Sequence, residues 1–444
     1  MERIVVHSDL NNFYASVERR LNPGLAGNPI AVCGNSEERK GVVLAKSEEA
    51  KRCGVKTGEA VWQAKRKCPE LVTVSPHFSE YKKYSRMARA VYAEYTDLIE
   101  PFGIDECWLD ITHSTKIFPR FSGDMYAEEE GERRFAPAYL QFLGDTLRER
   151  VKSVLGLTVS VGVSFNKVFA KLASDLKKPD GTTVIGLYNY KQKIYPLPVE
   201  DLLYVGKSTA EKLRRHGITT IGALACSPQG LAKQLLGKTG EMLLKYALGQ
   251  DEEPVRAEGE REELKSVGNS LTYPKDLTDY AEVKKQLFVL SESVAARLRE
   301  ADAGRADTVH LWVRGSDMNS FTAQKKVRAT VLCGEIAAHA FGLFCQRVRP
   351  PFAVRALGVT VSGFDKNLSQ MTFDEVDGDY KKREAAERAV DKIRKKYGYS
   401  AMQRGIAASD KEAAENDIKS THLIKPARFD DETWRAKRSK GVSL

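Results

Sequence analysis

The 444-residue sequence lacks any uncharged apolar run approaching the roughly 20 residues that span a membrane. It also lacks the features of a secretion signal, because the apolar run at its start is short and meets Asp9 at once. These absences argue against a membrane-spanning or secreted protein. We therefore expect a cytoplasmic one.

Cysteine is scarce, and its spacing does not indicate a disulfide framework. The sequence has seven cysteines, an odd number, and none forms a Cys-x-x-Cys pair. This pattern is typical of reduced thiols in a cytosolic protein. We predict neither disulfides nor a zinc site at these positions, which are Cys33, Cys53, Cys68, Cys107, Cys226, Cys333 and Cys345.

Acidic residues are fewer than basic ones, with 60 Asp and Glu against 70 Lys and Arg. The formal net charge of +10 and the pI near 9.0 favour a polyanionic partner such as nucleic acid, although many basic proteins bind none. Hydrophobic residues make up 42% of the chain, which is enough for folded cores. The length predicts roughly two to four domains.

The order of predicted elements indicates an α+β multidomain protein. Up to residue 165, strands and helices follow one another as in a mixed sheet covered by helices. Within that part, residues 113–137 lack periodicity and are predicted to be a loop. Residues 166–250 contain short helical segments and many glycines, which predicts a small helical domain.

The second half of the chain has a different pattern. Residues 251–263 are charged and aperiodic, so they are predicted to be a linker. A βαββαβ order over residues 264–363 predicts a ferredoxin-like domain. The tail, residues 364–444, contains one amphipathic helix at about 379–397 and then a polar end.

Three acids follow predicted strands: Asp9, and the adjacent Asp105 and Glu106 in the apolar sequence FGIDECWLD. Buried carboxylates repel one another unless they are neutralised, and a divalent metal is the chemical reason to gather them. Neighbours in a regular strand point to opposite faces, so we predict a hairpin that brings Asp105 and Glu106 to one site. The alternative is that Asp105 begins a turn and Glu106 is solvated. Asp110 is predicted to be a structural or capping acid.

Five segments carry a resemblance to a known family, in the family's order, over residues 3–363. They are SDLNNFYASVE (8–18), FGIDECWLDIT (102–112), VSVGVSFNKVFAKLASDLKKPDGTTVI (159–185), VGKSTAEKLRRHGITTIGAL (205–224) and KSVGNSLTYPKDL (265–277). The sequence resembles the Y-family translesion DNA polymerases of the polymerase IV type. Its finger segment also resembles the polymerase V-like branch.

The resemblance implies a right-hand polymerase fold, with a palm of mixed sheet and helices, small fingers, a helical thumb with a helix-hairpin-helix, and a ferredoxin-like little finger. The implied boundaries are palm at 1–27 and 79–165, fingers at 28–78, thumb at 166–250, linker at 251–263, little finger at 264–363 and tail at 364–444.

The resemblance also implies the chemistry. Asp9, the carbonyl of Leu10, Asp105 and Glu106 would hold two Mg²⁺ ions, with no organic cofactor. A primer 3′-hydroxyl would attack the α-phosphate of a deoxynucleotide and release pyrophosphate. Synthesis would be of low fidelity, opposite damaged template and without proofreading, in a bacterial cytoplasm and near the nucleoid during repair.

The nucleotide would meet four further residues. Tyr14 matches the aromatic steric gate that excludes a 2′-hydroxyl, and Phe13 precedes it. From the helix pattern alone, core packing is favoured for both, whereas the resemblance favours the gate at Tyr14 and core packing for Phe13. Lys171 matches a lysine that contacts the triphosphate, while Lys51 and Glu48 occupy finger positions that are usually Arg and Tyr. Lys51 supplies charge without the fork of Arg, and Glu48 should point away from phosphate.

Contacts to primer-template DNA are expected on two domains. Gly206 and Lys207 stand where the helix-hairpin-helix would present backbone N–H groups to a phosphate. The predicted little-finger strands carry Arg314, Lys325, Lys326 and Arg328, for which a solvated face is the alternative.

The tail segment SQMTFDE (369–375) resembles a degenerate sliding-clamp peptide, in which Gln370, Met371 and Phe373 would be the contacts. An ordinary surface linker is the alternative. We expect a monomer.

Two other functions remain open from the sequence. One is an inactive accessory protein that has a polymerase fold and binds DNA, which the altered finger positions Glu48 and Lys51 favour. The other is a different metal-dependent phosphoryl enzyme, such as a cyclase or nuclease, since palm-like sheets can host those chemistries too. A requirement for both primer and template would separate a polymerase from either alternative.

Overall fold

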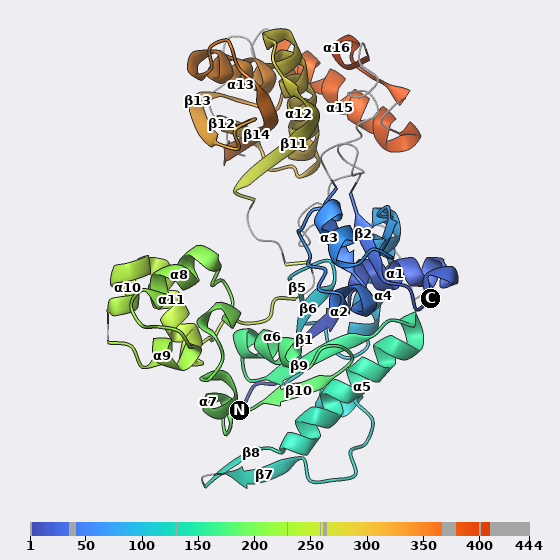
Figure 1. Ribbon diagram of the computed structural model, residues 1–444, viewed down its shortest axis with the longest axis vertical. Coiled ribbons are helices and arrows are strands. Elements are labelled where there is room, and N and C mark those ends of the chain that lie inside the picture. The colour runs from blue at the N-terminus through green and yellow to red at the C-terminus, as the bar shows by residue number, and fades with distance from the viewer. Residues whose placement is uncertain are drawn as a thin grey trace. The chain divides into compact units, whose positions relative to one another are not determined.

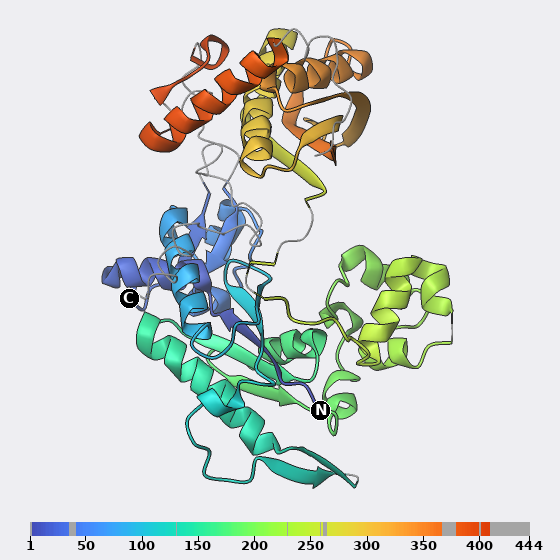
Figure 2. The same cartoon turned by 180° about the vertical axis from the view of Figure 1, so that it is seen from behind.

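The computed structural model describes residues 2–34, 41–129, 131–228, 230–257, 259–260, 264–365, 379–398 and 401–408. The chain divides into two compact units. The first holds the described residues up to 33 and from 43 to 260, and the second is built mainly from residues 264–408 (Figures 1 and 2). No helix among the described residues is long and apolar enough to cross a bilayer.

A five-stranded sheet in the order β10-β9-β1-β6-β5 forms the centre of the first unit (Figure 1). Strand β1 lies in the middle and is antiparallel to β6 and β9, while β9 and β10 are parallel. The bounds are β1 (Val5–Leu10), β5 (Ile99–Pro101), β6 (Glu106–Asp110), β9 (Val159–Ser164) and β10 (Thr182–Ile185).

Helices cover both faces of this sheet. Helices α1 (Phe13–Leu21), α4 (Phe78–Tyr92) and α5 (Pro137–Leu155) share one core with Val6 and Leu109. Helix α6 (Lys167–Leu176) packs on the other face, where Ala170 meets Val5 and Trp108. Because both faces are covered, β1 is an almost unbroken buried run.

Helix α6 approaches β9 closely at Gly162. A Cβ there would lie 1.9 Å from the carbonyl oxygen of Ala170, so only glycine permits this packing. The side chain of Asn166 caps α6 by accepting from the backbone N–H of Phe169 (2.8 Å). The start of α6 is thereby fixed at the edge of the sheet.

A small sheet in the order β3-β2-β4 occupies the region expected to be fingers. Its elements are β2 (Ile30–Cys33), β3 (Val43–Lys46), α2 (Glu48–Arg52), α3 (Val61–Lys67) and β4 (Val72–Val74). This part has its own core, which includes Ala50, Ala64 and Leu71. Two short 3₁₀ helices of the first unit are η1 (Pro23–Leu25) and η2 (Thr115–Ile117).

The prediction of a loop over residues 113–137 is wrong. Strands β7 (Tyr126–Glu129) and β8 (Glu132–Phe135) form an antiparallel hairpin there. Tyr126 and Phe135 stack across the pair with ring centroids 5.1 Å apart, and Phe135 is buried beside Tyr139. A cross-strand aromatic pair stabilises the hairpin, although its charged tip gives no hydrophobic periodicity.

The division expected at residue 166 does not coincide with a structural break. Strand β10 pairs with β9, and α6 packs on β9, so residues 167–185 belong with the sheet. The helical part follows, with α7 (Tyr190–Ile194), η3 (Val199–Asp201), α8 (Lys207–Arg214), α9 (Ile221–Ala225), α10 (Leu231–Leu236) and α11 (Lys238–Ala247). Phe169 and Leu172 of α6 enter the core of this helical part, which explains why the sequence grouped them.

The first residues of the expected linker pack on the large sheet. Val255 is buried against Trp108 and Ala170. The backbone N–H of Arg256 donates to Glu100 Oε2 at 3.0 Å. This stretch, although charged, therefore follows a fixed path beside β5 and β6.

The second unit has the predicted βαββαβ order, with β11 (Ser266–Leu277), α12 (Tyr280–Glu300), β12 (Arg305–Gly315), β13 (Ser320–Thr330), α13 (Cys333–Arg347) and β14 (Val354–Asp365). The strands lie in the order β11-β14-β12-β13, and all neighbours are antiparallel. Helices α12 and α13 cover one face, where Val309, Leu311 and Val313 enter the core.

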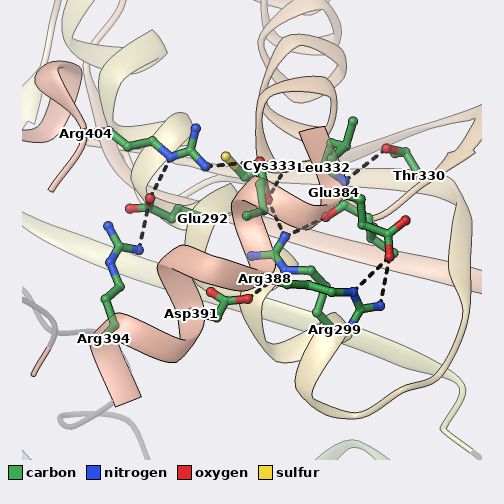
Figure 3. Close-up of polar contacts among 12 residues, drawn as sticks. Glu292, Arg299, Thr330, Leu332, Cys333, Glu384, Arg388, Asp391, Arg394 and Arg404 are labelled. Carbon is green, nitrogen blue, oxygen red and sulfur yellow. Dashed lines mark hydrogen bonds and ion pairs between the residues drawn. The ribbon is translucent and has the colours of Figure 1, made fainter. Parts of the chain in front are cut away.

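The predicted tail helix is confirmed as α15 (Asp379–Tyr397), and α16 (Gly405–Ala408) follows it. Both belong to the second unit. Figure 3 shows the ion pairs of α15 and Arg404 with α12 residues, including Glu292 and Arg299. These side chains fix the helical tail against the βαββαβ fold.

Candidate active site

The three predicted acids come together at one end of the large sheet. Asp9 of β1 is the register partner of Glu106 of β6, and the backbone N–H of Leu10 donates to the carbonyl of Asp105 at 2.9 Å. Strands β5 and β6 form the predicted hairpin, which places Asp105 in the turn and Glu106 at the first position of the strand. The turn removes the strand alternation that would otherwise separate the two side chains.

Glycine at position 103 of this turn leaves room for the acids. A Cβ there would lie 2.7 Å from Glu106 Cγ and 2.9 Å from Asp105 Oδ1. The backbone N–H groups of Phe102 and Gly103 both donate to the carbonyl of Glu106, which closes the turn. The hairpin is thus shaped around the two carboxylates.

The pKa values of the three acids shift in different directions, because burial and mutual repulsion raise them while His7 and Lys171 lower that of Glu106. Burial, followed by the charges of Asp9 and Glu106, raises the pKa of Asp105 to about 7. Burial also raises the pKa of Asp9. For Glu106, burial opposes ionisation, but the neighbouring His7 and the Lys171 charge outweigh it and lower the pKa to about 2. A divalent cation among these oxygens would counter both the burial and the repulsion that raise the pKa of Asp105.

Two lysines neutralise this cluster from α6 and the segment after it. Lys171 Nζ lies 2.5 Å from Glu106 Oε2. Lys178 Nζ lies 2.9 Å from Asp9 Oδ2 and 2.6 Å from Asp175. The sequence prediction included Lys171 and missed Lys178, although both fall in the segment 159–185 that resembles the family. The signal available for Lys178 was its position in a segment that the resemblance places beside the intact catalytic acids.

His7 is a second residue that the sequence prediction missed. Its Nδ1 lies 2.9 Å from the hydroxyl of Ser174, and its Nε2 lies 3.4 Å from Glu106 Oε2. Burial lowers the pKa of His7 and thereby favours a neutral ring. His7 is therefore anchored by Ser174, and its Nε2 is a buried nitrogen that lies beside the Glu106 carboxylate without a hydrogen-bond partner of its own among the described residues.

Several residues near the acids are structural. Asn11 accepts from Ser160 Oγ (2.8 Å) and donates to Thr158 Oγ1 (3.2 Å), so its side chain is engaged with β9. Asp110 caps the following turn by accepting from the backbone N–H of Thr112 (3.0 Å), as predicted. Lys167 is buried and pairs with Glu100.

Tyr14 and Phe13 have different environments at the start of α1. Phe13 is buried in the core of the sheet. Tyr14 is half-buried and stacks on Tyr81, with ring centroids 4.2 Å apart at 12°. Burial, together with the charge of Asp105, raises the pKa of the Tyr14 hydroxyl. Tyr14 thus lies within electrostatic reach of the acids, whereas Phe13 is a packing residue.

Glu48 and Lys51 lie on α2, where Ser47 caps the helix. Glu48 Oε1 accepts from the side chain of Asn12 (2.9 Å), and Lys51 Nζ lies 3.6 Å from it. Asn12 and Lys51 therefore hold the Glu48 carboxylate, which removes the objection that it would repel phosphate.

Gly206 and Lys207 are exposed at the start of α8, where Gly206 is the N-cap. The turn between α8 and α9 contains Gly217 at φ 77°, a conformation that favours glycine. The predicted pair of short helices with glycine turns is therefore present.

The second unit has one sheet face that its two helices leave uncovered. From Thr308 onward, the even-numbered residues of β12, including Trp312 and Arg314, alternate with the core residues Leu311 and Val313 and so lie on this open face. Lys326 is the partner of Thr308 there, and Arg328 alternates with Val327, which packs on the core. The open face therefore carries basic residues together with Trp312, over which Arg314 lies.

Lys325 differs from the other three basic residues. It is the register partner of the core residue Val309, so its side chain leaves the strand on the helix side, although it is exposed at the edge. Gln370, Met371 and Phe373 of the expected clamp peptide lie outside the described residues.

Comparison with known proteins gives the family. A family model described as the impB/mucB/samB family matches residues 8–175, and one described as its C-terminal domain matches residues 264–373. The chain is 44% identical over 415 residues to DNA polymerase IV of Acetivibrio thermocellus, covering 93% of this chain and 99% of that protein. The chain belongs to the Y family of DNA polymerases, in its polymerase IV type.

Other relatives of this Y-family polymerase agree. DNA polymerase IV 1 of Bacillus subtilis is 36% identical over 416 residues, which cover 93% of this chain and 94% of that protein. A solved Y-family DNA polymerase chimera matches with a TM-score of 0.67 at 24% identity, over 81% of this chain and 99% of the chimera. At that identity the structural likeness establishes the fold alone.

Proposed function

We propose that this chain is a template-directed DNA polymerase of the low-fidelity translesion type. It adds deoxynucleotides to a primer 3′-end opposite damaged template. The observation that carries the proposal is the convergence of Asp9, Asp105 and Glu106 at the sheet end, beside two lysines. Relatives up to 44% identical over most of the chain are named DNA polymerase IV.

Asp9, Asp105, Glu106 and the Leu10 carbonyl would hold two Mg²⁺ ions, because oxygen ligands of this kind suit that hard cation. The ions would supply charge stabilisation at the attacking and leaving oxygens. The chain's own contribution is positioning. The hairpin turn fixes Asp105 and Glu106, His7 lies beside Glu106, and Lys178 lies beside Asp9, where it can neutralise a triphosphate.

An inactive accessory protein is the second candidate, because Glu48 and Lys51 replace the usual finger residues. The contacts of Glu48 weaken this candidate, since Asn12 and Lys51 already hold the carboxylate. The acids of the site are also intact. We therefore favour the active enzyme.

Primer extension separates the candidates. The wild-type chain with Mg²⁺ and all four deoxynucleotides should extend a primer only when a template is annealed to it. Omission of template, primer or Mg²⁺ should each abolish the product, and so should Asp9→Asn. Product formation without a template would contradict the proposal, and so would tight duplex binding by the wild type with no extension.

We expect Tyr14→Ala to relax sugar discrimination, because the smaller side chain leaves room for a 2′-hydroxyl. Ribonucleotide incorporation relative to deoxynucleotide should rise by about 100-fold, measured as the ratio of kcat/KM values. Phe13→Leu is the matched control, since Phe13 lies in the core one residue away. An unchanged ratio in Tyr14→Ala would remove Tyr14 as the gate.

We expect Lys178→Met to raise KM for deoxynucleotides by about 10-fold, because a charge-assisted contact contributes about 1.5–3 kcal/mol. Lys177→Met is the control, since Lys177 is adjacent and exposed. An increase in KM for the control alone, or in neither variant, would argue against a triphosphate contact by Lys178. The same comparison applied to Lys171 and Lys51 would rank the three lysines as triphosphate contacts.

Primer-template DNA would contact the N-terminus of α8 at Gly206 and Lys207, and the open face of the second unit through Arg314, Lys326 and Arg328. Lys325 would add charge from the sheet edge. Binding of this kind is sequence-independent and weakens with salt. Lys326→Ala should therefore reduce the salt dependence of DNA affinity by about one ion, whatever the DNA sequence.

The remaining parts of the proposal come from the family resemblance. The chain would act as a monomer in a bacterial cytoplasm, near the nucleoid during repair. Gln370, Met371 and Phe373 would bind the sliding clamp. The palm, fingers, thumb and little finger would follow the expected ranges, with the palm extended to residue 185 because β10 pairs with β9.

A further inference from the structure

Two cysteines and one glutamate meet on the small sheet region, away from the acids of the polymerase site. Cys53, Cys68 and Glu70 each offer one ligand atom, and these atoms all lie within 4.8 Å of one another. Among the described residues, no other group of three or more His, Cys, Asp or Glu side chains gathers its ligand atoms so closely. We propose that this cluster binds a thiophilic divalent cation of the Zn²⁺ class.

The backbone explains how residues distant in sequence converge here. Cys53 is the C-cap of α2 and Cys68 is the C-cap of α3. The chain then turns, with the backbone N–H of Leu71 donating to the carbonyl of Cys68 at 3.0 Å, which brings Glu70 round to the two thiols. Both cysteines are therefore held by helix ends rather than by mobile loop positions.

The separations suit a tetrahedral ion. Two sulfurs on one Zn²⁺ lie about 3.8 Å apart, since each Zn–S bond is about 2.3 Å. The observed limit of 4.8 Å leaves only small side-chain rotations to reach that geometry. Three protein ligands leave the fourth position to water, and Cys53 and Glu70 are exposed, so an ion can enter from solvent.

The donor set distinguishes this site from the polymerase acids. Two sulfurs and one carboxylate favour a softer cation such as Zn²⁺, whereas the all-oxygen set at the sheet end favours Mg²⁺. Lys67, the residue before Cys68, pairs with Glu59 and donates to the carbonyl of Gly54. In the part of the chain that the structure describes, no ion pair engages Glu70.

The thiols also explain how the binding should depend on pH. Zn²⁺ binds the thiolate and not the thiol, so binding releases a proton. The affinity should therefore rise as pH increases from 6 to 8.

Co²⁺ and Zn²⁺ titrations of the full-length, reduced protein test the site, in excess Mg²⁺ so that the polymerase acids are saturated with the harder ion. Co²⁺ should produce thiolate charge-transfer absorption and tetrahedral visible bands, with one equivalent bound per chain. Zn²⁺ should displace it and raise the thermal midpoint, because a ligand that binds only the folded state stabilises it.

Matched variants decide the outcome. Cys53→Ser should weaken binding more than about tenfold, and Glu70→Gln should weaken it less while retaining the sulfur bands. Cys226→Ser, at an exposed thiol of the helical part, should change nothing. Cys68 is buried, so Cys53→Ser is the decisive variant, with its fold checked by circular dichroism.

Three results would overturn the proposal. They are the absence of thiolate bands in the wild type, folded Cys53→Ser with the affinity and band intensity of the wild type, and oxidation of the two thiols to a disulfide with no Zn²⁺ binding by the reduced protein. Because the readout is spectroscopic, none depends on polymerase activity. The cluster runs against the sequence-based prediction of no zinc site at these cysteines, which rested on their spacing, since 14 residues separate them and neither belongs to a Cys-x-x-Cys pair.

Discussion

Glu106→Gln should lower the rate of primer extension by about three orders of magnitude, with a small effect on DNA binding. The substitution removes one negative charge and keeps the shape of the side chain. In the folded chain Glu106 Oε2 lies 2.5 Å from Lys171 Nζ and 3.4 Å from His7 Nε2. Loss of the negative charge therefore leaves the positive charge of Lys171 without its partner. A loss of about 4 kcal/mol of transition-state stabilisation corresponds to this rate change.

Single-turnover extension with saturating DNA is the measurement, so that binding and chemistry are separated. Glu94→Gln is the control, because Glu94 forms an exposed pair with Arg150 outside the site. Glu106→Gln within a few-fold of wild type would exclude Glu106 from the reaction. An equal loss in the control would point to a general defect instead.

Arg299→Met should destabilise the second unit by about 3–5 kcal/mol, because it removes the buried cation that pairs with both Glu387 and Asp391. Arg299 is 6% exposed, Glu387 is 7% exposed, and the two form an ion pair, while Asp391 lies 2.7 Å from Arg299 (Figure 3). Glu387 also accepts from the backbone N–H of Cys333 at 3.2 Å. The pair therefore joins α12, α13 and α15.

Further ion pairs connect α12 and α15 to Arg404. Arg394 and Arg404 both pair with the buried Glu292 of α12, at 3.1 and 3.0 Å, and Arg404 reaches Glu387 at 3.1 Å (Figure 3). Loss of Arg299 should therefore loosen α15 before the strands unfold. Hydrogen exchange of α15, followed beside urea unfolding, would detect this order.

Arg388→Met is the control for Arg299→Met. Arg388 lies on α15, the helix that carries Glu387, but pairs with Glu384 of the same helix, so its loss should change the free energy of unfolding by less than about 1 kcal/mol. The double variant Arg299→Met with Glu387→Leu should recover part of the loss, because it removes both buried charges. Equal stability of the Arg299 and Arg388 variants would contradict a buried role for Arg299.

Local patterns were sufficient to predict many elements. The βαββαβ order and the helix at 379–397 follow from hydrophobic periodicity, which is a property of residues close together in the sequence. The hairpin at Asp105 and Glu106 was predicted from geometry, because neighbouring side chains in a regular strand point to opposite faces and cannot share one site. The β7–β8 hairpin was missed because one aromatic pair, rather than a period, stabilises it.

Side-chain direction required the register. Lys325 and Lys326 are adjacent and identical in kind, yet only Lys326 shares the open face with Arg314, because the partner of Lys325 is the core residue Val309. Likewise, the resemblance singled out Lys171, but the sequence could not show which acid each lysine of this segment would meet. The folded chain pairs Lys171 with Glu106, Lys178 with Asp9, and Lys167 with Glu100 below the site.

The sequence by itself determined the chemistry that the chain can perform. Residue types and their order along the chain provide the acids and the aromatic residue at position 14, and they determine the order of the domains. The tertiary structure decided which groups meet across long separations. Lys178 and Asp9 are 169 positions apart and Arg299 and Glu387 are 88 apart. No local pattern encodes such pairs, because they form only when strands and helices from different parts of the chain pack together and exclude water.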